Sequence, residues 1–326
     1  MQVGKQTYCS SIMLKGQTTL APQTAAILLV VVVASVLLSV GSSFITTPNN
    51  NIKFGRRFGN NRSHDHLVLG AESNDENELQ SSLLSASSRI EDCKKTLIEQ
   101  CKSHELDSGY SSSINTSIRN LEALGEDLGF GQASSVSGLL SGKWDLIYAS
   151  DDITRSSPFF WAFRRAFPDS SDQIFGITDA IPAPVKLVGP ATQDIELDAS
   201  SRGTLVSRVK VATLGGVATS IMTTRASVIG AEGVDGLRLK VETTKPEDST
   251  ILKKLGPLGE FVNANAKPFP SGEALERVAP GSSEVSMITT YLDEGLRITR
   301  NKDRTDEDVF VWVRVGEFGG GNTASL

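Results

Sequence analysis

Two stretches in the first half of the chain place apolar residues three and four positions apart, which is the spacing of a helix with one buried face. In the first stretch these residues are Leu79, Leu83, Ala86, Ile90, Cys93, Leu97 and Cys101. In the second stretch they are Ile114, Ile118, Leu121 and Leu124, and Gly125 is the expected stop of that helix. Because isolated helices of this kind are only marginally stable, residues 71–130 are predicted to be a helical region that packs on the rest of the protein.

In the second half of the chain, apolar and polar residues alternate, as they do in a half-buried β-strand. Leu237, Leu239 and Val241, for example, alternate with charged residues. Similar patterns predict strands at residues 144–148, 205–213, 218–229, 285–292, 296–300 and 309–315, and further strands are expected near Gln173–Thr178 and Thr192–Leu197. About eight short strands over residues 138–316 indicate a mainly β fold, an antiparallel barrel or sandwich. Residues 317–326 are expected to be a flexible tail.

The first 70 residues are typical of targeting sequences. Residues 1–43 contain an apolar stretch of 16 residues and end in a small-x-small pattern before Phe44. This stretch is short for a membrane span, which needs about 20 residues, so a cleaved signal peptide is predicted. Residues 44–70 carry four basic residues and one acid and resemble a transit peptide. The alternatives are a signal anchor, or ordinary secretion with Asn61 and Asn115 as glycosylation acceptors.

Charge and cysteine content narrow the range of partners. Of the 32 basic and 38 acidic residues, six basic residues and one acid lie in residues 1–70, so the remainder has 26 and 37 and a formal charge of −11. This acidic body argues against a general nucleic-acid-binding role. Cys93 and Cys101 are eight positions apart in a predicted helix, about 12 Å along its axis, so no disulfide is expected between them.

Histidine is missing from the predicted β region. The three histidines are His64, His66 and His104, and no cysteine follows Cys101. Ser-His-Asp and Cys-His catalytic pairs are therefore excluded there, as is zinc or iron held by His or Cys. Asp151-Asp152 is a conceivable acid–base pair, although adjacent acids in a turn are usually solvated. No catalytic residue, metal or cofactor is expected.

Gly142-Lys143-Trp144, at the start of the first predicted strand, is similar to the Gly-x-Trp of lipocalin-like barrels. In those barrels the tryptophan closes the base, and an arginine from a late strand lies over the indole. Arg297 and Arg300 are the candidates for this contact, and they lie on opposite faces of their strand. A buried arginine needs a partner, for which Tyr291, Asp293 or an acidic lipid group is the candidate. The alternatives are a tryptophan that lines a pocket and an arginine at the surface.

Residues 155–167 are unusually rich in aromatic and basic side chains. A helix here places four rings on one broad apolar face, bordered by Trp161 and two arginines; the four are Phe159, Phe160, Phe163 and Phe167. Such a face fits a membrane contact or a lid over a lipid-binding mouth. It fits equally a helix that packs into the core at one end of the barrel.

Three blocks resemble the signature of the plastid lipid-associated proteins, also called fibrillins. Leu140–Ser150 fits the family's Leu-x-Gly-x-Trp-x-Leu-x-Tyr-Thr-Ser, including Tyr148, with Ala149 in place of Thr. Tyr291–Arg300 fits Tyr-Leu-Asp-x-x-Leu-Arg-Ile-x-Arg throughout, and Phe310-Val311 matches the strand that follows. Ile118–Glu122 matches the Leu-Glu that ends the family's helical part. The turn Asn301–Asp308 departs from the family, in which a short Gly-containing turn stands here.

The resemblance implies a lipocalin-like antiparallel barrel in a plastid, associated with thylakoids or plastoglobules. It further implies apolar ligands such as carotenoids, quinones or fatty acids. A signal peptide followed by a transit-like segment resembles the bipartite presequence of algae with secondary plastids. Two alternatives stay open: a lipocalin-like enzyme acting on a carotenoid or oxylipin, and a lipid-globule coat protein without an internal ligand.

Overall fold

The structure is a computed structural model that describes residues 73–106, 108–130, 135–136, 138–179, 186–213, 218–254, 256–260 and 267–316. The segments interpreted as signal peptide, transit peptide and flexible tail lie outside these residues. The side chains of Leu79 and Leu83 also lie outside them.

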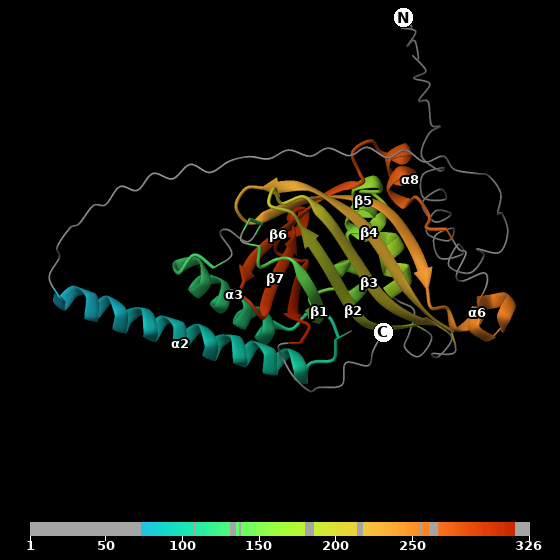
Figure 1. The fold of residues 1–326 in the computed structure, drawn as a ribbon. Coiled ribbons are helices and arrows are strands. Elements are labelled where there is room, and N and C mark those ends of the chain that lie inside the picture. Colours follow the sequence, from blue (N-terminus) through green and yellow to red (C-terminus); the bar gives the residue numbers. More distant parts are fainter. Residues whose placement is uncertain are drawn as a thin grey trace, which may run out of the picture.

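Eight antiparallel strands form a closed barrel, in which each strand pairs with its sequence neighbours and β8 pairs with β1 (Figure 1). The strands are β1 (Gly142–Ala149), β2 (Lys186–Leu197), β3 (Gly203–Thr213), β4 (Ala218–Glu232), β5 (Gly236–Glu247), β6 (Glu284–Leu292), β7 (Leu296–Asn301) and β8 (Val309–Arg314). Each of these eight strands therefore has a hydrogen-bonded neighbour on both sides. The prediction of a mainly β antiparallel fold is confirmed, and the fold is a barrel.

Alternation along the strands separates the barrel lumen from its outer surface. In β5, Leu237, Leu239 and Val241 are buried in the lumen, whereas Arg238 and Lys240 are exposed. This agrees with the period of two that the sequence shows. The expected strand at residues 192–197 is the second half of β2.

Helices α2 (Ser73–Ser103) and α3 (Ser112–Asp127) pack on the outside of the barrel beside β6, β7 and β1 (Figure 1). Their buried residues form a second core with outward side chains of the strands. This core contains Ile90, Leu97, Ile98, Cys101, Ile114, Ile118, Leu121, Tyr148, Tyr291, Leu296, Ile298, Val309 and Val311. From Ile90 onward, the buried positions of the two sequence stripes therefore face the barrel wall, and two helices precede the barrel. Cys93 and Cys101 are free thiols, as expected.

Gly125 does not end the second helix, and that expectation is wrong. Helix α3 continues to Asp127 with Gly125 buried inside it. A Cβ atom at this position would lie 2.9 Å from Cδ2 of Tyr291. The glycine is therefore required by close packing on the Tyr291 ring, which also stacks on Phe130 with 5.8 Å between ring centroids.

The remaining helices lie at the barrel ends. The short turn η1 (Ile153–Ser156) leads into α4 (Pro158–Ala166) and α5 (Ser171–Asp179), while α6 (Thr250–Lys254) and α8 (Ser271–Val278) follow β5. The expected strand at Gln173–Thr178 is wrong, because this segment belongs to α5. Short apolar runs do not distinguish helix from strand by pattern alone, and here contacts of Phe175 with the rings of Phe160 and Phe163 favour the helix.

Replacing Gly125 by alanine is expected to lower the free energy of unfolding by about 1–2 kcal/mol, because the new methyl group overpacks the Tyr291 ring. The matched control is Gly176→Ala in α5, where a Cβ atom would meet nothing within 4 Å. There the better helix propensity of alanine is expected to add up to about 1 kcal/mol. Urea denaturation of the full-length proteins measures both changes, and a stabilising Gly125→Ala would contradict the packing argument.

Candidate functional site

The base of the lumen is built around Arg297 of β7. Its guanidinium carbon lies 4.9 Å from the ring centroid of Trp144 and 4.9 Å from that of Trp312. The side chain is fully buried. Trp312 is itself fixed, because its Nε1 donates a hydrogen bond of 2.9 Å to Oγ1 of Thr299. Of the two candidates from the sequence, Arg297 lies over Trp144 and Arg300 does not.

The buried guanidinium of Arg297 has one hydrogen-bond partner. Nη2 donates to Oε1 of Gln193 at 2.8 Å, while Nε and Nη1 have no partner among the described residues. Burial, together with the positive charge of Arg314, lowers the pKa of Arg297 well below its ordinary value. No carboxylate in the described part of the chain forms an ion pair with it.

A second arginine explains the glycine of the Gly-x-Trp motif. The guanidinium carbon of Arg314 lies 4.3 Å from the Trp144 ring centroid, and its nitrogens donate to the carbonyls of Ser141 and Glu294. Gly142 has a φ of +142°, and a Cβ atom there would overlap Nη1 of Arg314. The sequence analysis did not identify Arg314. Its position two residues after Trp312 and four after Phe310, on the same face of one strand, could have indicated that it lies beside the lumen aromatics.

Arg300, Tyr291 and Asp293 lie on the outer side of the barrel, where they hold the two helices. Arg300 binds both carboxylate oxygens of Glu122 in α3, with Nη2 2.8 Å from Oε2. Tyr291 donates to Asp293 at 2.9 Å, and the same carboxylate binds Lys94 of α2 at 2.7 Å. Neither Tyr291 nor Asp293 partners an arginine, which corrects that expectation. Burial and the adjacent carboxylate raise the pKa of Tyr291 far above its ordinary value.

Tyr148 likewise points to the helices and not into the lumen. Its hydroxyl accepts hydrogen bonds from the backbone N–H of Ser111 at 3.0 Å and from Nδ2 of Asn115 at 2.7 Å. Burial is the main cause that raises its pKa. The family-like blocks therefore do two things: Gly142, Trp144 and Arg297 build the lumen base, while the tyrosines, Asp293 and Arg300 dock the helices.

A row of polar residues crosses the lumen wall on four adjacent strands. Gln193, Ser207, Thr224 and Thr244 are register partners from one strand to the next, and all four are buried. Thr244 forms a hydrogen bond of 2.9 Å with Ser271. The hydroxyls of Ser207 and Thr224 have no partner among the described residues. Sequence reasoning missed this row, because each member is a single polar residue in an otherwise apolar alternation.

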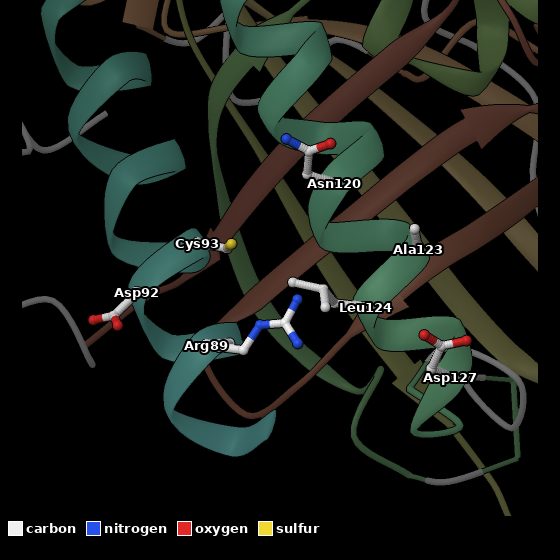
Figure 2. Close-up of a pocket in the computed structure, with 7 residues that line it drawn as sticks. All are labelled: Arg89, Asp92, Cys93, Asn120, Ala123, Leu124 and Asp127. Atoms are coloured by element: carbon white, nitrogen blue, oxygen red, sulfur yellow. The ribbon is translucent and has the colours of Figure 1, made fainter. Parts of the chain in front are cut away.

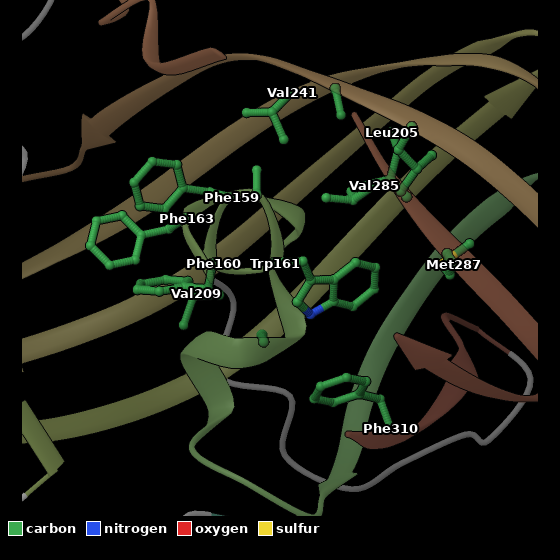
Figure 3. Close-up of a cluster of buried hydrophobic side chains, with 14 of the residues drawn as sticks. Phe159, Phe160, Trp161, Phe163, Leu205, Val209, Val241, Val285, Met287 and Phe310 are labelled. Carbon is green, nitrogen blue, oxygen red and sulfur yellow. The ribbon is translucent and has the colours of Figure 1, made fainter. Parts of the chain in front are cut away.

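The aromatic segment 155–167 fills one end of the lumen. Phe159, Phe160, Trp161, Phe163 and Phe167 are at most 8% exposed, and Figure 3 shows the rings of α4 among lumen residues such as Leu205, Val209 and Val285. Trp161 packs on Phe310 with 6.1 Å between ring centroids. The helix therefore packs into the core, and in this structure it presents none of these rings to a membrane.

The long turn Asn301–Asp308 anchors α4 at its last turn. Arg164 donates to Oδ2 of the buried Asp308 at 2.9 Å and to Asp151 at 3.2 Å. Asn301 donates to the same Asp308 oxygen at 3.2 Å. Asp152 accepts from the backbone N–H of Thr154 at 2.8 Å. Asp151 and Asp152 thus pair with α4 and η1 and do not form an acid–base pair.

A separate hollow of about 470 Å³ lies on the outside, between α2 and α3 (Figure 2). It is lined by Arg89, Asp92, Cys93, Asn120, Ala123, Leu124 and Asp127. Its lining mixes charged and apolar groups, with no lumen residue among them.

No protein-family model matches the chain, and no curated protein or solved structure is significantly similar to it. Within the described ranges, no helix has the length and apolar character needed to cross a membrane. The same residues contain no group of three or more His, Cys, Asp or Glu placed to hold a metal ion.

Replacing Gly142 by alanine is expected to lower the free energy of unfolding by about 2–3 kcal/mol, through backbone strain and displacement of Arg314. The control is Gly138→Ala, which also has a positive φ of +76° but meets nothing within 4 Å. Strain alone costs about 1–2 kcal/mol. Equal losses in the two variants, measured by urea denaturation, would contradict the role given to Arg314.

Proposed function

We propose that this protein binds an apolar lipid inside a lipocalin-like barrel, as a member of the plastid lipid-associated (fibrillin) family. The closed lumen supports this proposal most directly. Its wall is apolar over most of its length, with residues such as Leu205, Val209 and Leu239 facing inward. One end is closed by the contact of Arg297 with two indoles. A water-excluding cavity wall with few polar groups is what an acyl or isoprenoid chain requires.

Helix α4 is the element that an entering lipid must displace. Its rings occupy the lumen together with Phe175 of α5. It is held at its C-terminal turn by the ion pairs of Arg164, which lie partly at the surface. We infer that α4 acts as a lid, whose aromatic side chains line the bound lipid once they leave the lumen centre.

The alternative of a lipocalin-like enzyme has less support. Catalysis in the lumen without His or Cys needs a carboxylate or a tyrosine there. Tyr148 and Tyr291 face the outer helices. Asp308 is the buried acid among the described residues, and it is neutralised by Arg164.

The alternative of a lipid-globule coat also has less support. It needs the aromatic face of residues 159–167 at the surface, and these rings are buried. A coat role would then require α4 to leave the barrel in the absence of any internal ligand, which would expose the apolar lumen to water.

Lipid binding is tested by native mass spectrometry and solvent extraction of the full-length protein. About one lipid per chain is expected in the barrel. Val209→Phe adds volume to the lumen and is expected to reduce the bound lipid several-fold. The control Val206→Phe places the same group on the outer face of β3, where Val206 is half-buried, and should retain the lipid. A lipid-free protein that still partitions to lipid globules would favour the coat alternative.

The plastid location is a proposal based on residues 1–70. A fluorescent reporter fused to these residues is expected to enter the plastid of an alga with secondary plastids. The matched control carries residues 1–43 alone and should stay in the secretory route, because it lacks the transit-like segment. Secretion of the longer fusion would contradict the proposal.

A further inference from the structure

The lumen contains a charge that the described part of the chain does not neutralise. Arg297 is fully buried, and two of its three guanidinium nitrogens have no hydrogen-bond partner there. The neighbouring charge is another cation, Arg314, which is directed to backbone carbonyls. Burying a cation without an anion is costly, and proteins normally pair such groups. The two indoles offset only a part of this cost through their cation–π contacts with the guanidinium.

Unpartnered hydroxyls continue from this cation along the lumen wall. Arg297 reaches Gln193 of β2, whose register partner on β3 is Ser207, and Ser207 is opposite Thr224 of β4. Opposed residues on adjacent antiparallel strands are about 4.5–5.5 Å apart. The buried hydroxyls of Ser207 and Thr224 have no partner within the described ranges. One free donor, Ser207, thus lies opposite the Gln193 side chain that Arg297 binds, and a second, Thr224, lies one strand further along the row.

The start of helix α4 adds a third donor of the same kind. Nε2 of Gln193 donates to the carbonyl of Ser156 at 3.1 Å, which brings this helix end to the polar row. Ser157 is the N-cap residue, its side chain makes no capping hydrogen bond, and its buried Oγ is unpartnered among the described residues. A helix N-terminus favours negative charge. The cation, the hydroxyls and the helix end each favour a negatively charged group, and Gln193 connects them, since it contacts Arg297 and Ser156 and is opposite Ser207.

We propose that this arrangement is an anion subsite within the lumen and that it binds the carboxylate of a lipid with an acidic head group. Arg297 supplies the charge, and Ser207, Thr224 and Ser157 donate hydrogen bonds to the carboxylate oxygens. The inference rests on the proposed lipid-binding function and narrows its ligand class. Neutral carotenoids and quinones then lack the group that this subsite takes.

The charge balance favours a carboxylate over a phosphate monoester. Arg297 is a single cation, so a monoanion neutralises it, whereas a phosphate monoester carries close to two charges at neutral pH and leaves one of them buried. The wall beside the hydroxyls is apolar: Leu205 and Val209 flank Ser207, while Met222 and Ala226 flank Thr224. The ligand that matches this wall is an amphiphile whose polar head lies at the row of hydroxyls and whose chain lies along these apolar residues.

The test compares a fluorescent polyene fatty acid, cis-parinaric acid, with its methyl ester on the full-length protein. The two ligands share the chain and differ in head-group charge. Charge-assisted hydrogen bonds to a buried carboxylate predict that the acid binds at least about tenfold more tightly than the ester. Equal affinities for the acid and the ester would overturn the anion subsite and leave the proposed lipid binding intact.

Arg297→Gln is expected to remove this preference, weakening binding of the acid at least about tenfold with the ester unchanged. The control is Arg225→Gln, the same change at an arginine on the outer surface whose side chain is 55% exposed and near Glu242. It should alter neither affinity. An Arg225→Gln variant that loses the preference as Arg297→Gln does would overturn the assignment.

A second variant keeps the test decisive if Arg297→Gln does not fold. Ser207→Ala combined with Thr224→Val removes two unpartnered buried hydroxyls with little change of volume, so it should fold without loss of stability. The acid is expected to bind several-fold more weakly to it, and the ester equally well. Unchanged binding of the acid would exclude these hydroxyls from the subsite.

Inorganic phosphate added without lipid distinguishes a lipid head from a free anion. Thermal stabilisation by millimolar phosphate that is as large as that by the fatty acid, and that is lost in Arg297→Gln, would replace the lipid assignment with a small-anion site. Failure of both the acid and the ester to bind, with no lipid in the extract, would refute the proposed function itself, and this inference with it.

Discussion

The barrel closes around one buried cation. Arg297 of β7 contacts Trp144 of β1, Trp312 of β8 and Gln193 of β2, so a single side chain joins the strands on both sides of the closing pair. Cation–π contacts in a dry site are stronger than at a surface. They also require the two indoles in one orientation, which the bond from Trp312 to Thr299 and that from Trp144 to the Leu140 carbonyl supply. The glycine at position 142 is part of the same requirement.

The outer face of the same strand fixes the helices. Because successive side chains of a strand alternate, Arg297 and Thr299 enter the lumen, while Leu296, Ile298 and Arg300 meet α2 and α3. A shift of one residue would exchange these two sets. It would bury Arg300 without Glu122 and expose Arg297 to the apolar helix faces. Lumen closure and helix docking therefore depend on one register between β6, β7 and β8.

The sequence predicts the features that repeat along the chain, such as helix stripes and strand alternation. It does not predict contacts between residues that are far apart in the chain. The stripes of α2 and α3 and the alternation of β5 follow from local spacing. Gly125 was misread because its signal as a helix stop is local, whereas its cause is the ring of Tyr291, more than 160 residues away. The segment of α5 was misread for the same reason. Taken singly in the sequence, Ser207 and Thr224 are typical of surface positions. The register of β3 with β4 is what makes them neighbours in the lumen.

The rings of α4 and the polar row together bear on why the lumen contains buried polar groups. The rings of α4 cover the apolar wall, but two guanidinium nitrogens of Arg297 and the hydroxyls of Ser207, Thr224 and Ser157 have no hydrogen-bond partner among the described residues. A purely structural core gains nothing from these groups, since replacing unpartnered buried polar groups by apolar ones is usually neutral or stabilising. Their cost is offset if an amphiphile supplies both an acidic head for the row and a chain for the space of the rings.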